Sequence, residues 1–172
     1  MSGITTEELR AIQEPLKRRY RDDPASAVVT LEADGSLDEG VACTVDTGRA
    51  LVQAGLHPAT GGSGMLACSG DMLLQALVAC AGVTMRAVAT SLGITVGGSV
   101  HAEGDLDFRG TLSVDKEAPV GFTSIRLKFA LETEADEDQV ATLLRLTERY
   151  CVVFQTLAGS PALSVTMSPP AS

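Results

Sequence analysis

The chain has 172 residues, of which 45% are hydrophobic and 20% are charged. This length predicts one domain, residues 1–172, and the balance of apolar and charged residues excludes a disordered or fibrous chain. With 13 basic and 22 acidic side chains, the net charge is −9. Like charges repel, so we expect no nucleic-acid partner and no binding to an anionic membrane surface.

The N-terminal residues do not have the pattern of a targeting signal. Residues 1–23 are rich in charge and lack the apolar core of a secretory signal. The longest uncharged apolar run, Met72 to Met85, is shorter than a helix that spans a bilayer. We therefore expect no membrane segment and a cytoplasmic location, where thiols stay reduced.

The first predicted element is a helix over residues 5–21, with Thr5 or Thr6 as its N-cap. Pro15 falls inside the pattern and predicts a kink or a break. We assign residues 1–25 to an N-terminal helical extension of the main domain, which runs over residues 26–168.

Three short strands are predicted next, over residues 28–31, 41–45 and 49–54. Their apolar residues alternate with polar ones, as in half-buried strands. Asp34–Gly35 and Thr47–Gly48 are turn signals between them. This part of the chain is predicted to be an antiparallel meander.

The most apolar predicted element is a helix from Met72 to Leu92, capped by Ser69 or Asp71. Its only charge is Arg86, so it is apolar on nearly every side and belongs in the centre of a protein or of a dimer. One antiparallel sheet covers only one side of such a helix. A second copy of the chain is therefore expected to cover the rest, which predicts a homodimer.

The second half of the chain predicts two long amphipathic strands, over residues 96–108 and 121–132. A helix follows from Thr133, then one or two apolar helical turns over residues 150–157, and a last strand over residues 163–167. The order of helices and strands is that of an α+β fold.

Two other motifs have structural explanations. Residues 62–67 match a dinucleotide-binding fingerprint in form, but no parallel strand–helix–strand unit and no acidic residue about twenty positions on accompany them. We interpret this segment as a flexible loop. His57 and His101 have no Ser or Cys partner nearby in sequence, so we expect structural or surface roles for both.

The four cysteines carry the main functional question. Cys43, Cys68, Cys80 and Cys151 include no closely spaced pair, which disfavours a structural zinc site, and we expect neither a metal nor a cofactor. Cys43 alternates with valines and is expected in the core. Cys68 lies in a loop, as an idle residue or an alternative resolving thiol.

Cys80 and Cys151 are each open to a core role or a reactive role. Cys80 lies in a long apolar run, and apolar burial raises the pKa of a thiol. Cys151 follows Arg149 and Tyr150, and a nearby guanidinium favours the nucleophilic thiolate.

The segments Cys68–Met85 and Thr147–Leu157, in this order and separation, resemble the OsmC/Ohr family. The segments Asp105–Gly110 and Gly121–Arg126 fit the same pattern, and the resemblance covers residues 26–168. It implies an intertwined homodimer in which long central helices lie between antiparallel sheets.

The resemblance also implies an activity, because the better-known members are thiol peroxidases that reduce organic hydroperoxides. Carried over, Cys80 is the peroxidatic thiolate and Cys151 the resolving thiol. The peroxide oxidises Cys80 to a sulfenic acid, which condenses with Cys151 to a disulfide. A dithiol reductant, lipoyl-type in the family, then reduces the disulfide by exchange.

The chain departs from the family at the charged residues that assist the thiolate. The family uses a Glu and an Arg, and here Asp71 stands at the acidic position and Gly61 at the Arg position of one subgroup. Arg49 is the nearest upstream substitute, and Arg149 and Arg86 are the other candidate cations. Without the Arg motif, a non-catalytic dimer that binds a small hydrophobic molecule, or a thiol redox sensor, is the alternative function.

One constraint on Asp71 is purely geometric. It lies nine residues before Cys80, about 13.5 Å along a helix and half a turn round it. The two side chains cannot meet within one helix, so we expect Asp71 to serve Cys80 only across a dimer interface.

Overall fold

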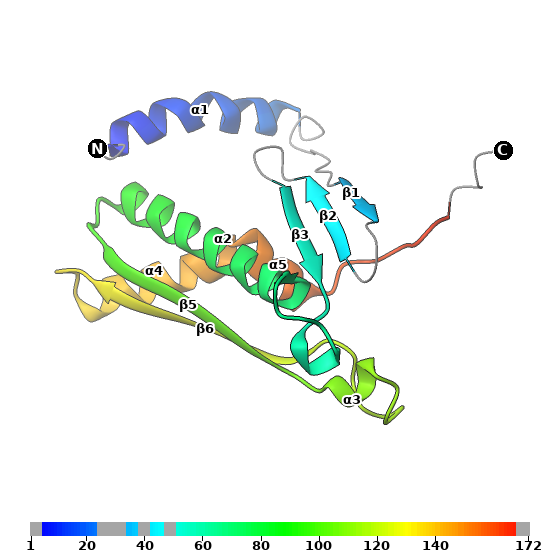
Figure 1. Ribbon diagram of the computed structural model, residues 1–172. Coiled ribbons are helices and arrows are strands. Elements are labelled where there is room, and N and C mark those ends of the chain that lie inside the picture. The colour runs from blue at the N-terminus through cyan, green and yellow to red at the C-terminus, as the bar shows by residue number, and fades with distance from the viewer. Residues whose placement is uncertain (1–4, 24–33, 38–41, 47–50, 168–172) are drawn as a thin grey trace.

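The computed structural model describes residues 5–23, 34–37, 42–46 and 51–167. Figure 1 shows a small sheet on one side of a long helix and a long hairpin on the other. The strands of the small sheet are β1 (Asp34–Leu37), β2 (Ala42–Asp46), β3 (Leu51–Gly55) and β4 (Ala67–Cys68). They lie in the order β1-β2-β3-β4, with antiparallel pairs except β3 and β4, which are parallel.

The predicted meander is confirmed at β2 and β3. The strand expected over residues 28–31 and the turn at Thr47–Gly48 lie outside the described residues. Asp34–Gly35 is not a turn, because it begins β1 and pairs with Asp46 and Val45 of β2. The hydrogen bonds between the two strands outweigh the local turn preference of this dipeptide.

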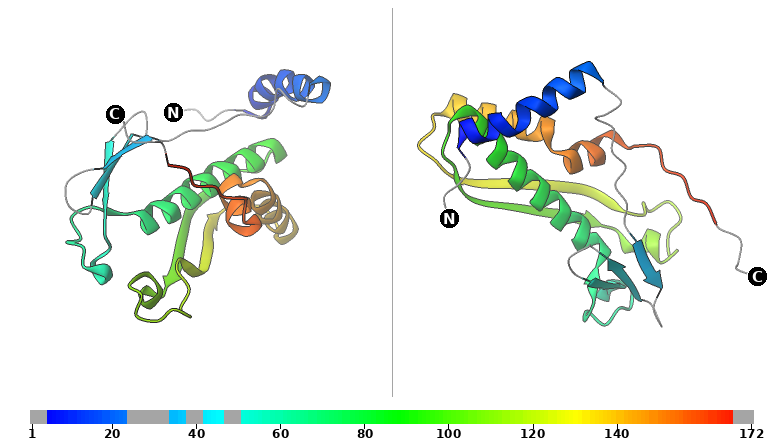
Figure 2. Two further views of the ribbon diagram at one scale, coloured as in Figure 1. Left: turned by 90° about the vertical axis from the view of Figure 1, so that its right-hand side faces the viewer. Right: turned by 90° about the horizontal axis from the view of Figure 1, so that it is seen from above.

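The rest of the chain forms a second layered unit. Its elements are α2 (Ser69–Leu92), β5 (Gly97–Leu106), α3 (Phe108–Thr111), β6 (Phe122–Glu132), α4 (Glu137–Tyr150) and α5 (Val152–Gly159), with a short 3-10 helix at Pro58–Thr60 in the preceding loop. The two long strands form an antiparallel hairpin, as their period of two predicts. Figure 2 shows α2, α4 and α5 on the same face of this hairpin.

Two clusters of buried side chains hold the helices on the hairpin. One joins Met85, Val88 and Ala89 of α2 to Leu143 of α4, with Phe129 against them. The other cluster joins α2, the break between α4 and α5, the hairpin and α5 through Leu77, Ala81, Cys151, Ala102, Ile125, Leu127, Val153, Phe154 and Leu157. The second cluster also contains Cys80, so the core and the candidate site share the same packing.

The helix α2 confirms the element predicted from Met72 to Leu92 and begins three residues earlier. It has 24 residues, begins at Ser69 after Cys68 in the N-cap position, and has neither of the predicted caps. By length and composition alone it is apolar enough to cross a membrane, a test that the core helix of a soluble protein also passes. Its inner face packs against α4, α5 and β5, whereas Val83 on its outer face is 70% exposed.

Two predicted elements of the C-terminal half differ in the structure. The helix α4 begins at Glu137 rather than near Thr133, because Asp136 and Gln139 form a capping box there. The Thr133 hydroxyl donates a hydrogen bond to the Thr95 carbonyl instead (2.7 Å). The last predicted strand is wrong for a single chain: residues 160–167 are irregular, and Val165 is 97% exposed.

The N-terminal helix α1 (Thr6–Asp22) runs through Pro15 as one element. It lies over the C-terminal end of α2 (Figure 1), where the Thr6 hydroxyl donates a hydrogen bond to the Thr90 carbonyl (2.9 Å). Gly93 ends α2 in the left-handed conformation, with φ of 71°. Its exposed backbone turns the chain into β5.

The outer face of the hairpin carries a network of ion pairs. Glu103 accepts hydrogen bonds from Lys128 (2.8 Å) and Arg126 (3.0 Å), and Arg126 also pairs with Asp105. Hydrogen bonds from Lys128 and Arg126 lower the pKa of Glu103 from 4.5 to about 2. The network links neighbouring strands across positions that face water.

We predict that this network loses its contribution to stability in acid. The folded-state pKa of Glu103 is depressed, so its contribution is complete above the unfolded value near 4.5 and disappears as the pH falls toward about 2. Replacing Glu103 by Gln removes this titration, so the acid-induced loss in unfolding free energy shrinks in urea titrations from pH 6 to pH 2, relative to the loop control Glu134→Gln. An equal loss in both variants contradicts the assignment.

Candidate active site

The structure brings Cys80 and Cys151 together from distant parts of the sequence. Cys80 lies midway along α2 and is half-buried, and Cys151 lies between α4 and α5 and is 1% exposed. The two thiols lie close enough for each to shift the pKa of the other, and they form no disulfide. The pair is therefore in contact in its reduced form, with Cys80 the thiol that solvent reaches.

Cys151 marks a break between two helices. It is both the C-cap of α4 and the N-cap of α5, with an extended backbone (φ −72°, ψ 107°). Its N–H donates to the Thr147 carbonyl and its carbonyl accepts from the Gln155 N–H, both at 2.9 Å. The first N–H groups of α5 are consequently without partners in their own helix.

These free N–H groups are directed at Cys80. Four neutral donors near its sulfur lower its pKa: the backbone amides of Val152 and Val153, the Cys151 thiol, and the Thr84 hydroxyl, which in the reduced pair donates to the Cys80 carbonyl (2.8 Å). Burial, the largest single effect, raises the pKa of Cys80, but together the four donors lower it below the ordinary thiol value. A helix N-terminus favours a negative charge in the same sense.

Cys151 has the opposite shift. Burial is the largest effect and raises its pKa, and its hydrogen bond to Cys80 raises it further, because donating to the neighbouring sulfur requires the proton. The amide of Phe154 acts in the other direction without reversing the result. The pair is thus divided into a thiolate-forming Cys80 and a protonated Cys151.

The Glu148 carbonyl shows how the break is maintained. In a continuous helix this carbonyl would accept the Val152 N–H, four residues on. Here it accepts the side-chain amide of Gln155 instead (2.9 Å). This replacement leaves the Val152 amide available to the Cys80 sulfur.

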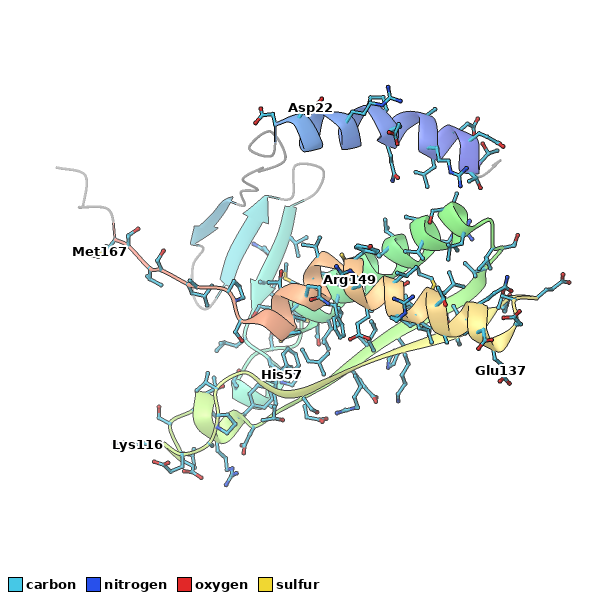
Figure 3. All side chains as sticks on the ribbon, turned by 180° about the vertical axis from the view of Figure 1, so that it is seen from behind. Asp22, His57, Lys116, Glu137, Arg149 and Met167 are labelled. Carbon is cyan, nitrogen blue, oxygen red and sulfur yellow. The ribbon has the colours of Figure 1, made fainter. Side chains whose placement is uncertain are left out.

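The candidate cations have other positions. Arg49 lies outside the described residues, and its role stays a prediction. Arg86 donates to the Val96 carbonyl (2.5 Å). Arg149, labelled in Figure 3, lies over the ring of Tyr150, 5.8 Å from its centre. The groups that lower the pKa of Cys80 among the described residues are neutral donors, where a cation was expected.

Asp71 and Cys68 lie far from Cys80 within one chain. Asp71 is exposed in the first turn of α2. Cys80 lies nine residues further along the same helix, about 13.5 Å along its axis. Cys68 precedes Cys80 by twelve residues, or about 18 Å along the axis. Cys68 therefore cannot resolve Cys80 within a single subunit. The core position expected for Cys43 stays a prediction, because its side chain lies outside the described part of the chain.

The two histidines have structural environments. The ring of His57 stacks on Phe108 at 5.0 Å, beside α3 (Figure 3), and its Nδ1 accepts a hydrogen bond from the Ala59 amide. His101 is exposed on β5, opposite Lys128. Within the described residues, no group of three or more His, Cys, Asp and Glu side chains is placed to hold a metal ion.

The glycine-rich loop also has a structural explanation. A Cβ on Gly62 would lie 1.7 Å from the Leu56 carbonyl oxygen, so only glycine fits that close approach. The loop ends in β4, which pairs with β3 and positions the start of α2.

A groove lined mainly by apolar side chains, with Thr123 and Ser124 also in its wall, lies between α2, β6 and α5. It has a volume of about 300 Å³, and its walls come from α2, β6 and α5, with the apolar side chains Leu77, Phe122, Ile125, Leu127, Phe154 and Leu157. Leu77 and Phe154 also belong to the cluster that contains both cysteines. Cys80 and Cys151 are not among the residues that line the groove, and these two shared side chains connect the groove to the cysteine pair.

Comparison with known proteins identifies the fold and the family. The model of the OsmC-like protein family matches residues 62–166. The chain has no match among curated proteins. Among solved structures, the OsmC-like protein from Mycoplasma pneumoniae is similar with a TM-score of 0.64 and 17% identity, over 76% of this chain and 89% of the other.

Two further structures share the fold at low identity. A hypothetical protein from Aquifex aeolicus has a TM-score of 0.60 and 16% identity, over 77% of this chain and 90% of its own. An OsmC-like protein of unknown function from Vibrio cholerae has a TM-score of 0.59 and 13% identity, over 75% and 94%. The α+β fold, the long helix on an antiparallel sheet and the family match agree with the resemblance in sequence, and the chain belongs to the OsmC-like family.

Proposed function

We propose that this protein is a thiol-dependent peroxidase that reduces organic hydroperoxides through Cys80 and Cys151. One observation carries the proposal: of two thiols in contact, the more accessible has the lowered pKa and the buried one the raised pKa. A two-cysteine peroxidase needs this division, because the thiolate is the nucleophile and the second thiol must wait until the first is oxidised.

In the first step the Cys80 thiolate attacks the terminal oxygen of the hydroperoxide. A sulfur–oxygen bond forms and the oxygen–oxygen bond breaks. The alkoxide leaves with the bonding electrons and takes up a proton to become the alcohol. Cys80 is oxidised to the sulfenic acid.

In the second step the Cys151 sulfur attacks the sulfur of the Cys80 sulfenic acid. A disulfide forms, and the hydroxyl of the sulfenic acid leaves as water with the Cys151 proton. The existing contact between the two side chains means that only a short movement separates the reduced pair from the disulfide.

A dithiol reductant, for which we propose the lipoyl type, completes the cycle. Its first thiolate forms a mixed disulfide with one cysteine, and its second thiol displaces that cysteine, so the reductant leaves as a disulfide and both protein thiols are restored. We propose a cytoplasmic location, because the cycle needs a compartment that supplies reduced dithiols.

The apolar groove supports an organic substrate. Its walls bury an alkyl or aryl group, and burying such a group contributes about 25 cal/mol per Å². Hydrogen peroxide has no apolar part and gains nothing from this surface.

We also propose that Asp71 and Arg49 form an ion pair that reaches Cys80 across a dimer interface.

The cysteine variants test the proposal. We expect Cys80→Ser to abolish consumption of cumene hydroperoxide with dihydrolipoamide, because no nucleophile remains. Cys151→Ser allows one oxidation and leaves Cys80 open to overoxidation, detected as added oxygen in the peptide mass. Cys68→Ser is the matched control and retains turnover, since Cys68 is about 18 Å away. Oxidation of Cys80 without turnover in the unmodified protein would contradict a peroxidase and indicate a sensor.

The role of the α5 amides is testable with one proline. Val152 is the first residue of α5 and its side chain is 69% exposed, so Val152→Pro removes the N–H at a position that tolerates proline. A hydrogen bond to an ionised group contributes about 1.5–3 kcal/mol, so alkylation of Cys80 by iodoacetamide at pH 7 should slow by about tenfold or more.

Val152→Ala is the control for the lost side chain, because it keeps the N–H and should alkylate at the unmodified rate. Circular dichroism checks that both variants retain their helices. Equal alkylation rates in the proline and alanine variants would exclude the Val152 amide as a contributor.

A homodimer is the proposed assembly. Val83 is 70% exposed on the outer face of α2, and Leu73, nearer the start of the helix, is 38% exposed. We expect a dimeric mass by light scattering at micromolar concentration and a shift toward monomer in Val83→Glu. A monomeric mass for the unmodified protein overturns this prediction.

A further inference from the structure

We propose that the Thr84 hydroxyl is a switchable hydrogen-bond donor that turns from its helix carbonyl to the Cys80 sulfur when that sulfur becomes negatively charged. This inference deepens the proposed function and rests on the role of Cys80 as the nucleophile. It gives a specific function to a threonine that otherwise looks like an ordinary helix residue.

The position of Thr84 in α2 is the first support. It lies four residues after Cys80, on the same face of the helix, and side chains in a helix lean toward its N-terminus. The Thr84 hydroxyl donates to the Cys80 carbonyl at 2.8 Å. It is also within hydrogen-bonding reach of the Cys80 sulfur and lowers the pKa of that thiol.

A hydroxyl has one proton and cannot serve both acceptors at once. The Cys80 carbonyl already accepts the Thr84 backbone N–H in the regular pattern of α2. The carbonyl therefore keeps a partner when the hydroxyl rotates away. The sulfur gains most from the donor when it is charged, because hydrogen bonds to ionised groups are the stronger ones.

The other groups around Cys80 leave this contribution measurable. Within the described residues, the hairpin side chains packed around it are apolar, and the charges of Glu103, Arg126 and Lys128 lie on the outer face. On α2 itself, Arg86 is six residues further on and bonded to Val96. From α4 and α5 the neighbouring titratable group is Cys151, since Arg149 lies over Tyr150.

The test compares two threonines of the same helix. Thr84→Val keeps the shape and the branched side chain but removes the hydroxyl. Thr90→Val is the matched control, because Thr90 also donates its hydroxyl to the carbonyl four residues back (Arg86, 2.8 Å) but lies well beyond Cys80. Any general cost of losing such a bond in α2 appears in both variants.

The measurement is the rate of Cys80 alkylation by iodoacetamide across pH, followed by peptide mass, which needs no peroxide turnover. Because the thiolate loses one charge-assisted hydrogen bond, we expect the Thr84→Val rate at pH 7 to fall by roughly threefold to tenfold and the rate profile to move to higher pH. Thr84→Ser should restore the profile. Thr90→Val should match the unmodified protein.

The high-pH limit separates a donor from a structural residue. Once the thiol is ionised in both proteins, the Thr84→Val rate should equal or slightly exceed the unmodified rate, since a thiolate of higher pKa is intrinsically more nucleophilic. An unchanged profile, or a rate reduced equally at every pH, overturns the proposal. A shifted profile in a protein with no peroxidase turnover supports the role of Thr84 and contradicts the proposed function alone.

Discussion

The candidate site depends on a single break in the helical backbone at Cys151. If α4 continued into α5 as one helix, the Val152 and Val153 amides would bond to carbonyls of α4 and could not reach Cys80. The break frees them, and the Gln155 side chain satisfies the Glu148 carbonyl that the break leaves open. The residue that makes the break is also the thiol that touches Cys80, so the backbone geometry and the chemistry of the pair are fixed together.

Neutral donors give the site a different character from one activated by a side-chain cation. A guanidinium must be held by a carboxylate and is screened by salt when exposed. Backbone amides have no titration and no side-chain freedom to lose, and they act at contact distance. In a chain of net charge −9 this arrangement allows a thiolate without a basic patch around it. If Arg49 of a partner subunit lay beside Cys80, its guanidinium would further stabilise a thiolate that the neutral donors already favour.

The sequence predicted α1, β2, β3, α2, β5 and β6, through strand or helix periodicity in most of them and through the long apolar run in α2. It also placed Cys80 and Cys151 in the two key segments through the family resemblance. It did not predict the activating amides, because a backbone N–H has no signature in residue type. The available signal was the short apolar helical segment expected over residues 150–157, which in the structure begins only after Cys151, at Val152. The start of α4 was misplaced because the capping box at Asp136 outweighs the earlier polar residues.

The failed prediction of a C-terminal strand and the exposed face of α2 have a common explanation in the proposed dimer. Leu163, Val165 and Met167 alternate with polar residues, the pattern of a strand with one apolar face, yet in the single chain they form no strand and are about nine-tenths exposed. A strand needs a neighbour to satisfy its backbone and cover its apolar side. Val83 likewise presents apolar surface that α4, α5 and the hairpin do not cover. Sequence periodicity records which faces are apolar, and it does not state whether the covering surface belongs to the same chain or to a second copy.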